Sequence, residues 1–373
     1  MPKKKILLFC LFLLVGFFAV SYRENSIRSD TSLKKEKTEV KQITDEKQVV
    51  KKAVYPIKTL EDGQKSEDIL PKGSVVSVKT VPENDEWVEI IADPKKGFIK
   101  KQVLAPRSTY IKNREKKRKK KLDQSQFKTK MDQELTEFMA KNGGDISVYL
   151  KTTDDKFTYN FYGDEIKRTA SSIKLPCISY VMELADKGEI DLDSSLTYTK
   201  QFKIDGTGII QFAPIGSSYT IKELAELSIR YSDNVAYLML LDLVGEPNFI
   251  QYLAELDENS PDNRVFSTAK ILTESMDQVY KNRKNSSNTN LLYQWMQQTV
   301  FDNGVAVGLP GVDVAHKTGW MPMYTVSNDV ALIEDQKNPY IMTIMTNGYD
   351  EKYGAQVLAD LAVIIDDNML MLK

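Results

Sequence analysis

Three short polar motifs, in a fixed order, constrain this chain more than any other feature. They read Ser171-Ser-Ile-Lys174, Tyr231-Ser-Asp-Asn234 and His316-Lys-Thr-Gly-Trp320. A serine with a lysine three residues later occurs four times, at Ser32, Ser125, Ser171 and Ser267. Only the occurrence at Ser171 is followed, at domain-scale spacing, by both of the other motifs. The chain therefore needs a fold that brings three distant segments together.

The composition excludes several kinds of site. The only histidine is His316, and the only cysteines are Cys10 and Cys177. This rules out a disulfide framework, a cysteine metal site and any metal centre that needs two histidines. We expect no metal and no cofactor. It also disfavours a Ser-His-Asp arrangement, so a lysine is the expected base if Ser171 is a nucleophile.

The N-terminus has the pattern of a membrane anchor or signal segment. Lys3-Lys-Lys5 precedes an apolar run over residues 6–20, which predicts a cytoplasmic N-terminus and an exported remainder. Ala19-Val-Ser21 also fits a cleavage site. For residues 1–22 two interpretations stay open: a single membrane span that leaves the C-terminal domains extracellular, or a cleaved signal that releases them. Residues 23–52 are charged, lack apolar periodicity and predict a flexible tether.

Residues 53–106 have the pattern of a small all-β barrel. The alternating stretches 75–78 and 87–91 are separated by turn residues such as Pro71-Lys-Gly73. Their spacing resembles that of bacterial Src-homology-3-like domains, which implies contact with a cell wall. The alternative is a spacer barrel without a ligand.

A basic segment follows the barrel. Within the predicted linker 107–125, residues 112–121 include eight basic residues and one acid, Glu115. Two hypotheses account for it: a solvated linker, or a surface that binds anionic polymers or lipid headgroups outside the cell. The net charge of the whole chain is −1, and we expect no nucleic acid partner for an exported protein.

The remaining residues, 126–373, predict one α/β domain. We expect helices at 127–141 and 352–366, strands at 146–150, 156–161, 313–316, 326–333 and 341–346, and mostly helical sequence in the middle. Strands at both ends of the segment indicate a sheet in which the two ends of the sequence meet.

Ser171 and Lys174 have the spacing of a nucleophile and its base. Residues three apart share a helical face, so the Lys174 amine can lie against the Ser171 hydroxyl. Free N–H groups at a helix start also favour an oxyanion. Lys174 must be neutral part of the time to act as a base, and burial and a second cation, Lys317, would both lower its pKa. An isolated motif of this kind would more simply be a capping serine and a surface lysine.

The second motif lies between two helical stretches, 221–229 and 235–243. In that position Ser232 could relay a proton to a leaving nitrogen, and Asn234 could hold a substrate amide. By itself, the motif would more simply be a helix cap without a further function.

The third motif is expected at the end of a strand. Lys317 and Thr318 can bind a carboxylate, and Gly319 lets a substrate backbone lie along the strand edge. The N–H of Trp320 could complete an oxyanion hole with the N–H of Ser171. His316 is interpreted as a strand side chain rather than a catalyst.

Together these residues make the segment from 126 to the end resemble the class A β-lactamases and related penicillin-recognising serine hydrolases. Further stretches share the likeness: Lys174-Leu-Pro, Ala185-Asp-Lys-Gly-Glu-Ile-Asp191, Gly206-Thr-Gly-Ile-Ile-Gln211 and Tyr219-Thr-Ile-Lys-Glu-Leu224. The resemblance implies a β-lactamase/transpeptidase-like fold with a five-stranded antiparallel sheet flanked by helices. It also implies that Ser171 is acylated with Lys174 as its partner. The matching binding and proton-transfer positions are Ser232, Asn234, Lys317 and Thr318.

One departure from the family concerns deacylation. Class A β-lactamases place a glutamate, with an asparagine shortly after it, on a loop beyond Ser-Asp-Asn. The corresponding residues here, 249–267, look shortened and contain Glu255, Asp257 and Glu258 without the Glu-x-x-Leu-Asn pattern. We therefore assign no deacylation residue.

Three functional hypotheses follow. The first is an exported, membrane-anchored serine hydrolase that forms an acyl-enzyme with β-lactams or related amides, including peptidoglycan stem peptides. Its variant is a penicillin-binding D-Ala-D-Ala peptidase that lacks the deacylating glutamate. The second is a non-catalytic cell-wall-binding scaffold, and the third is an esterase that uses the same serine.

Overall fold

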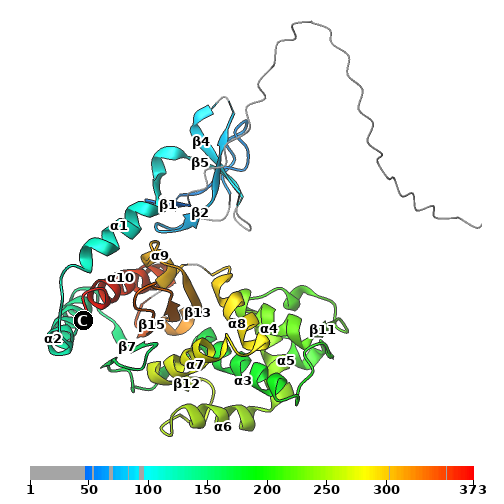
Figure 1. Cartoon of the computed structure of the whole chain (residues 1–373). Helices are drawn as coiled ribbons and strands as arrows, with labels where there is room; N and C mark the ends of the chain where they lie inside the picture. The colour runs from blue at the N-terminus through cyan, green and yellow to red at the C-terminus, as the bar shows by residue number, and fades with distance from the viewer. Residues whose placement is uncertain are drawn as a thin grey trace, which may run out of the picture. The chain divides into compact units, whose positions relative to one another are not determined.

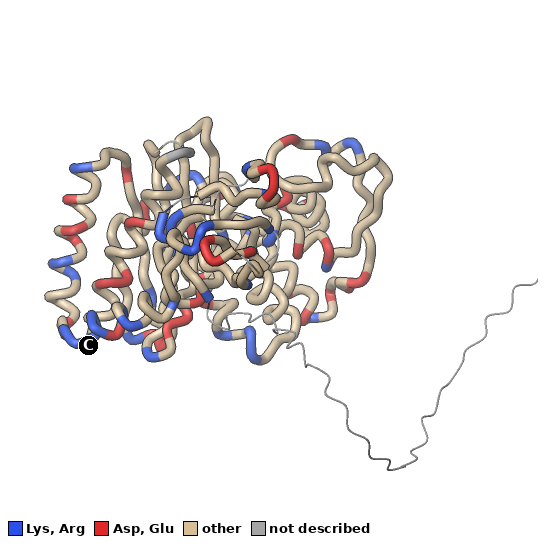
Figure 2. Tube along the Cα trace, turned by 90° about the horizontal axis from the view of Figure 1, so that it is seen from above, with Lys and Arg blue, Asp and Glu red and all other residues tan. Residues whose placement is uncertain are grey.

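The structure is a computed structural model and describes residues 47–52, 54–66, 70–82, 84–91, 96–301, 303–349 and 351–373. These residues belong to one compact unit (Figure 1). The predicted anchor or signal segment, 1–22, and most of the predicted tether lie outside the described residues. Basic and acidic residues are interspersed along the trace (Figure 2).

The predicted single membrane span is not supported and is corrected here. Within the described ranges, no helix combines the length and the apolar character needed to cross a membrane. Helix α2 (Gln124–Asn142) illustrates why, since its 19 residues bury only Phe127, Met131 and Leu135. These three lie four residues apart on one face, as expected of a surface helix packed on a core. The segment that prompted the prediction, residues 1–22, lies outside the described residues.

Two small antiparallel sheets make up the N-terminal part, with strand orders β2-β1-β6 and β3-β4-β5. Their elements are β1 (Gln48–Val50), β2 (Val75–Val76), β3 (Val78–Val81), β4 (Asn84–Ile90), β5 (Gly97–Lys100), the 3₁₀ turn η1 (Lys101–Val103) and β6 (Leu104–Pro106). Strand β1 falls within residues 23–52, which were predicted to be a tether. It belongs to the folded unit instead, because Val49 and Val50 are fully buried in it. The resemblance to Src-homology-3-like domains stays a prediction.

The first part of the basic segment, residues 112–117, belongs to a helix, and residues 118–121 follow that helix. Helix α1 (Arg107–Lys117) begins directly after β6. Arg114 pairs with Asp335 at 2.7 Å and with Asp366, and all three side chains are largely buried. Arg107 donates from Nε to the carbonyl of Pro310 at 2.7 Å. The arginines therefore fasten α1 to the following domain, and the lysines remain outside: Lys112, Lys116, Lys117, Lys119, Lys120 and Lys121 are exposed.

A five-stranded antiparallel sheet organises the rest of the chain, in the order β13-β14-β15-β7-β8. The strands are β7 (Asp145–Thr152), β8 (Thr158–Phe161), β13 (Val314–Met321), β14 (Val326–Ile333) and β15 (Tyr340–Asn347). The pairing of β15 with β7, for example Ile344 with Val148, joins the two ends of the sequence as predicted. Strand β13 extends five residues beyond its predicted end at His316, so it carries the whole third motif.

Helices cover both faces of this sheet (Figure 1). Helix α10 (Glu351–Met369) packs on one face with α2 and α9 (Val305–Gly308), and α7 (Ala269–Asn282) and α8 (Ser287–Gln297) pack on the other. All eight residues of β14 are buried as a result. One apolar core lies on the α10 face.

A second apolar core lies among the helices of the middle segment. Its main helices are α3 (Lys174–Asp186), α4 (Ile221–Arg230), α5 (Asn234–Val244) and α6 (Glu246–Leu256). Short elements border these helices: β9 (Lys167–Arg168), η2 (Ala170–Ile173), β10 (Ser195–Thr197), η3 (Lys200–Phe202), η4 (Ile210–Phe212), β11 (Ser218–Thr220) and β12 (Phe266–Ser267). The 3₁₀ turn η5 (Pro322–Tyr324) instead joins β13 to β14. Helix α3 lies in the centre of this core, where Leu175, Cys177 and Ile178 are fully buried. The first motif therefore starts a helix that cannot shift without disturbing the core.

Candidate active site

Ser171 lies on a 3₁₀ turn, η2, that runs directly into α3. The preceding residue, Ala170, has a φ of 48°, and Ser232 in the second motif has a φ of 49°. Both values fall in the left-handed region, which costs non-glycine residues of order 1 kcal/mol or more. Hydrogen bonds hold the Ser232 backbone there, since its carbonyl accepts from Lys174 Nζ and from Thr207 Oγ1, both at 2.6 Å.

Lys174 connects the first two motifs. Its Nζ lies 3.1 Å from Ser171 Oγ, 3.1 Å from Ser232 Oγ and 2.7 Å from Asn234 Oδ1. The Lys174 side chain is 2% exposed. The predicted contact between the serine hydroxyl and the lysine amine is thus present, and the amine also reaches both functional side chains of the second motif.

Lys317 brings the third motif to the same point. Its Nζ lies 3.1 Å from Ser232 Oγ and 2.9 Å from the carbonyl of Thr318. Ser232 Oγ therefore lies between two fully buried lysine amines. An uncharged hydroxyl flanked by two such amines is well placed to pass a proton.

Burial changes the protonation of both lysines. Desolvation, followed by the nearby Lys317, lowers the pKa of Lys174 well below its usual value, and Asp233 acts weakly in the opposite direction. Desolvation lowers the pKa of Lys317 to about 7, against an opposing effect of Asp329. A neutral amine at Lys174 is therefore accessible at physiological pH.

Gly319 allows β13 to pack against the nucleophile's turn. A Cβ atom at this position would lie 2.6 Å from the carbonyl oxygen of Thr169 and 2.8 Å from the amide nitrogen of Ser172. Any side chain here would push the strand away from Ser171. Thr318 and Trp320, on either side of Gly319, line the same cavity as Ser171.

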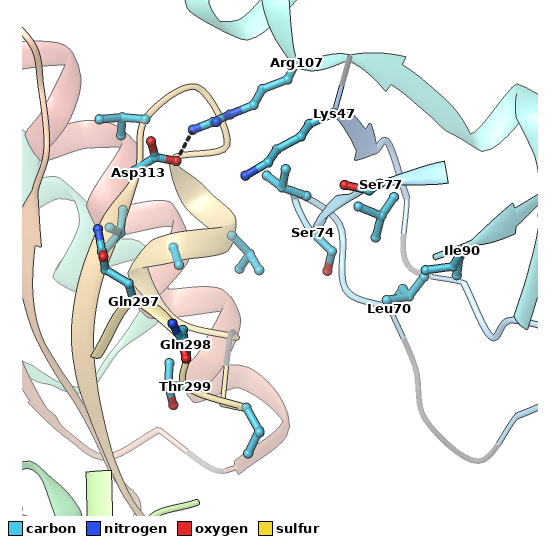
Figure 3. A pocket seen from close by; sticks show the side chains of 18 of the residues that line it. Lys47, Leu70, Ser74, Ser77, Ile90, Arg107, Gln297, Gln298, Thr299 and Asp313 are labelled. Atoms are coloured by element: carbon cyan, nitrogen blue, oxygen red, sulfur yellow. Dashed lines mark hydrogen bonds and ion pairs between the residues drawn. The ribbon is translucent and has the colours of Figure 1, made fainter. Parts of the chain in front are cut away.

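This cavity has a volume of about 460 Å³ and contains residues of all three motifs. The predicted residues that line it are Ser171, Lys174, Ser232, Asn234, Thr318 and Trp320. A larger cavity of about 570 Å³ lies elsewhere, beside the ion pair of Arg107 with Asp313 (Figure 3). None of the predicted site residues lines it, so the motifs identify the site better than cavity size does.

The wall of the motif cavity carries no carboxylate among the described residues that line it. The acids of the segment considered for deacylation lie elsewhere: Asp257 pairs with Lys270 at 2.6 Å, and neither Glu255 nor Glu258 lines the cavity. No group within the described wall is thus suited to activate a deacylating water as a carboxylate base would.

His316 is a buried strand side chain, as interpreted from the sequence. Its Nδ1 lies 3.0 Å from both carboxylate oxygens of Asp329, and the residue is not among those lining the motif cavity. Asp329 also accepts a hydrogen bond from the amide of Val305 at 2.9 Å, which ties β14 to α9.

Sequence reasoning missed several residues that position the site. Asp233 is fully buried and accepts hydrogen bonds from the amides of Ala236, Ile209 and Ile210. It therefore caps α5 and holds the 206–210 loop over the cavity. The sequence offered one indication of this role, because Asp233 lies inside the second motif, between Ser232 and Asn234.

Asn328, on β14, was also missed. Its side chain donates to the carbonyls of Arg168 and Thr169 at 2.8 and 3.0 Å and accepts from the amide of Thr346. This ties the strand before Ser171 to the sheet. No local pattern around Asn328 indicates the role, because its partners are about 160 residues away.

Comparisons with known proteins agree with this geometry. A model of the beta-lactamase enzyme family matches residues 130–369. The beta-lactamase of Bacillus licheniformis is 26% identical over 260 residues, which cover 64% of this chain and 83% of that protein. Beta-lactamase 3 of Bacillus cereus is 27% identical over 243 residues, covering 59% and 75%.

Solved structures share the fold. The structure of PBP-A has a TM-score of 0.59 and 23% identity, covering 66% of this chain and 96% of that one. A class A beta-lactamase from Mycobacterium abscessus has a TM-score of 0.56 and 23% identity, covering 63% and 97%. These likenesses confirm the predicted β-lactamase/transpeptidase-like architecture.

Proposed function

The chain belongs to the beta-lactamase enzyme family and is a class A β-lactamase-like serine hydrolase, and we propose that it works through an acyl-enzyme on Ser171. The observation that carries this proposal is the position of the buried Lys174 amine, 3.1 Å from both Ser171 Oγ and Ser232 Oγ. An amine in that place can accept a proton from the Ser171 hydroxyl. It can also donate a proton to the Ser232 hydroxyl, which protonates the leaving group.

Acylation proceeds in two steps on this geometry. Neutral Lys174 accepts the Ser171 proton as Oγ attacks the substrate carbonyl carbon, and a tetrahedral oxyanion forms. Ser232 then gives its proton to the leaving nitrogen and is reprotonated from Lys174. The carbon–nitrogen bond breaks, and the acyl group remains as an ester on Ser171.

Substrate binding uses the remaining residues. Lys317 and Thr318 bind a substrate carboxylate, and Asn234 holds the amide on the acyl side. Gly319 leaves the edge of β13 open to the substrate backbone. The amides of Ser171 and Trp320 stabilise the oxyanion.

We propose that the acyl-enzyme is long-lived. Hydrolysis of the ester needs a base for water, and the described cavity wall has no carboxylate. This feature favours penicillin-binding peptidase behaviour, with D-Ala-D-Ala peptides as substrates, over efficient β-lactam turnover. One relative by fold, a mutant of PBP-A, was solved as an acyl-enzyme complex with penicillin G.

The test is a time course of intact mass for the full chain mixed with benzylpenicillin. We expect one penicilloyl adduct per chain that persists for many minutes, and none in Ser171→Ala. Rapid loss of the adduct with release of penicilloate would contradict the long-lived intermediate. No adduct at all would refute acylation by β-lactams and favour the scaffold or esterase hypothesis, which p-nitrophenyl esters distinguish.

A separate proposal concerns partners. The N-terminal β unit and the exposed lysines of α1 would contact an anionic cell-wall polymer, provided that the chain is exported. The support is the outward position of Lys112 and Lys116, which take no part in the arginine ion pairs. Cosedimentation with purified cell walls should fall steeply between low and high salt. Salt-independent binding, or none, would refute an electrostatic contact.

A further inference from the structure

The motif cavity holds more positive charge than the proposed reaction uses. Of the described residues that line it, Lys174 and Arg264 are basic, and none is acidic. Lys317 adds a second lysine amine through its contact with Ser232. The proposed reaction assigns Lys174 to proton transfer and Lys317 to one carboxylate, which leaves Arg264 without a role. A cavity lined by basic residues attracts negatively charged ligands.

The backbone fixes Arg264 close to the nucleophile. The Thr169 amide donates to the carbonyl of Val265 at 3.0 Å, and the Thr169 hydroxyl donates to that of Arg264 at 3.3 Å. Residue 169 is two positions before Ser171, so the segment that carries Arg264 borders the reacting group. Arg264 is thus positioned by Thr169, the residue that precedes the turn carrying Ser171.

The ion pair with Glu246 leaves the Arg264 guanidinium able to bind a further anion. Its Nε lies 3.1 Å from Glu246 Oε1, but the Glu246 side chain is 46% exposed and that of Arg264 is 29% exposed. Ion pairs that water reaches are weak. A ligand carboxylate inside the cavity can therefore compete for the guanidinium.

Tyr237 adds a second sign of a missing ligand beside Arg264. It lines the cavity and is 5% exposed, and its hydroxyl interacts with the Arg264 guanidinium but makes no well-aligned hydrogen bond within the described part of the chain. A buried hydroxyl without a partner is costly, so it is normally satisfied by protein, water or ligand. Burial raises the pKa of Tyr237, which keeps the phenol a neutral donor, and the guanidinium of Arg264 lies 5.8 Å from its ring centre.

From these observations we propose that Arg264 and Tyr237 form a second carboxylate-binding subsite, which selects acyl donors that carry a carboxylate on the acyl side. The inference rests on the proposed function, because the acyl donor is the substrate of Ser171. Tyr237 is three residues after Asn234 on α5, and its ring centre is 5.9 Å from Lys174 Nζ. The subsite therefore adjoins the side chain that holds the acyl-side amide.

Two penicillins that differ in one group provide the test. Carbenicillin carries a side-chain carboxylate that benzylpenicillin lacks. We measure the second-order rate constant for acylation of the full chain by each compound and take the ratio, carbenicillin over benzylpenicillin. Arg264→Gln should lower this ratio about tenfold, the effect of losing about 1.4 kcal/mol of charge-assisted binding. Tyr237→Phe should lower it by about threefold, as for loss of one neutral hydrogen bond.

Glu246→Gln is the matched control. It removes the ion-pair partner of Arg264 but keeps the guanidinium, so the ratio should stay at the wild-type value or rise. A ratio that falls equally in Glu246→Gln and Arg264→Gln would mean that the ion pair acts only on local structure, which overturns the subsite. A ratio unchanged in Arg264→Gln overturns it as well. Absence of acylation by either compound in the wild-type chain would instead overturn the proposed function, and the subsite with it.

Discussion

Replacing Lys317 by methionine should move the acid limb of the acylation rate to higher pH. Lys317 and Lys174 both lie 3.1 Å from Ser232 Oγ, so their amines are at most 6.2 Å apart. Two unit charges at that distance repel by at least about 2.7 kcal/mol at an effective dielectric constant of 20. Removing the charge of Lys317 therefore raises the pKa of Lys174.

The acid limb moves to higher pH because Lys174 acts as the base. The base must be neutral, and a higher pKa keeps it protonated to higher pH, so the rate falls off earlier as the pH is lowered. The shift is fully expressed only where Lys317 is charged in the wild type, which means below its pKa of about 7.

The assay is the burst of p-nitrophenol from p-nitrophenyl acetate between pH 5 and 9. This ester has no carboxylate, so weaker carboxylate binding in Lys317→Met does not enter the profile. Lys222→Met, which changes an exposed lysine on α4, is the control and should match the wild type. An acid limb that stays in place or moves to lower pH in Lys317→Met would refute the electrostatic coupling of the two lysines.

Three further predictions concern stability and packing. Because the pKa of Lys317 is lower in the folded than in the unfolded chain, its protonation opposes folding fully below about pH 7 and not at all above its usual pKa of 10.5. Lys317→Met should thus raise the free energy of unfolding, and with it Tm, by about 3 kcal/mol more at pH 6 than at pH 9; an equal change at both pH values would contradict this. Arg114→Ala removes the cation that pairs with the buried Asp335 and Asp366, so it should lower the free energy of unfolding, measured by urea denaturation, by about 3 kcal/mol. Lys112→Ala should change it by no more than about 0.5 kcal/mol. Equal effects of these two variants would show that α1 is not fastened by its arginines. Gly319→Ala should slow acylation at least about tenfold, because its Cβ meets the turn that carries Ser171; a wild-type rate would disprove that close packing.

Local patterns predicted the parts of the fold that depend on neighbours in sequence. Strand β14 has the predicted bounds, 326–333, and the spacing of Ser171 and Lys174 placed hydroxyl and amine in contact. Strand β13 was predicted too short, because its polar residues, including Lys317 and Thr318, hide its strand pattern. Lys317 is tolerated there because its amine reaches Ser232 Oγ and the carbonyl of Thr318.

Long-range partners explain what the sequence could not reveal. The basic stretch looked solvated because its counter-ions, Asp335 and Asp366, lie more than 200 residues further along the chain. Val49 and Val50 looked like part of a tether, since a three-residue strand has too few residues to show a period. Arg264 has no motif around it, and only the fold shows that it lines the cavity.

The most direct test of the central claim is to locate the acyl group. The full chain is exposed briefly to benzylpenicillin, quenched in acid and mapped by tandem mass spectrometry, with Ser171→Ala and Ser172→Ala alongside. Ser172 is the matched control, because its buried hydroxyl donates to the carbonyl of Thr169 at 2.6 Å rather than contacting Lys174. The account predicts modification at Ser171 in the wild type and in Ser172→Ala, and none in Ser171→Ala. An acyl group on any other residue, or one that survives in Ser171→Ala, would contradict it.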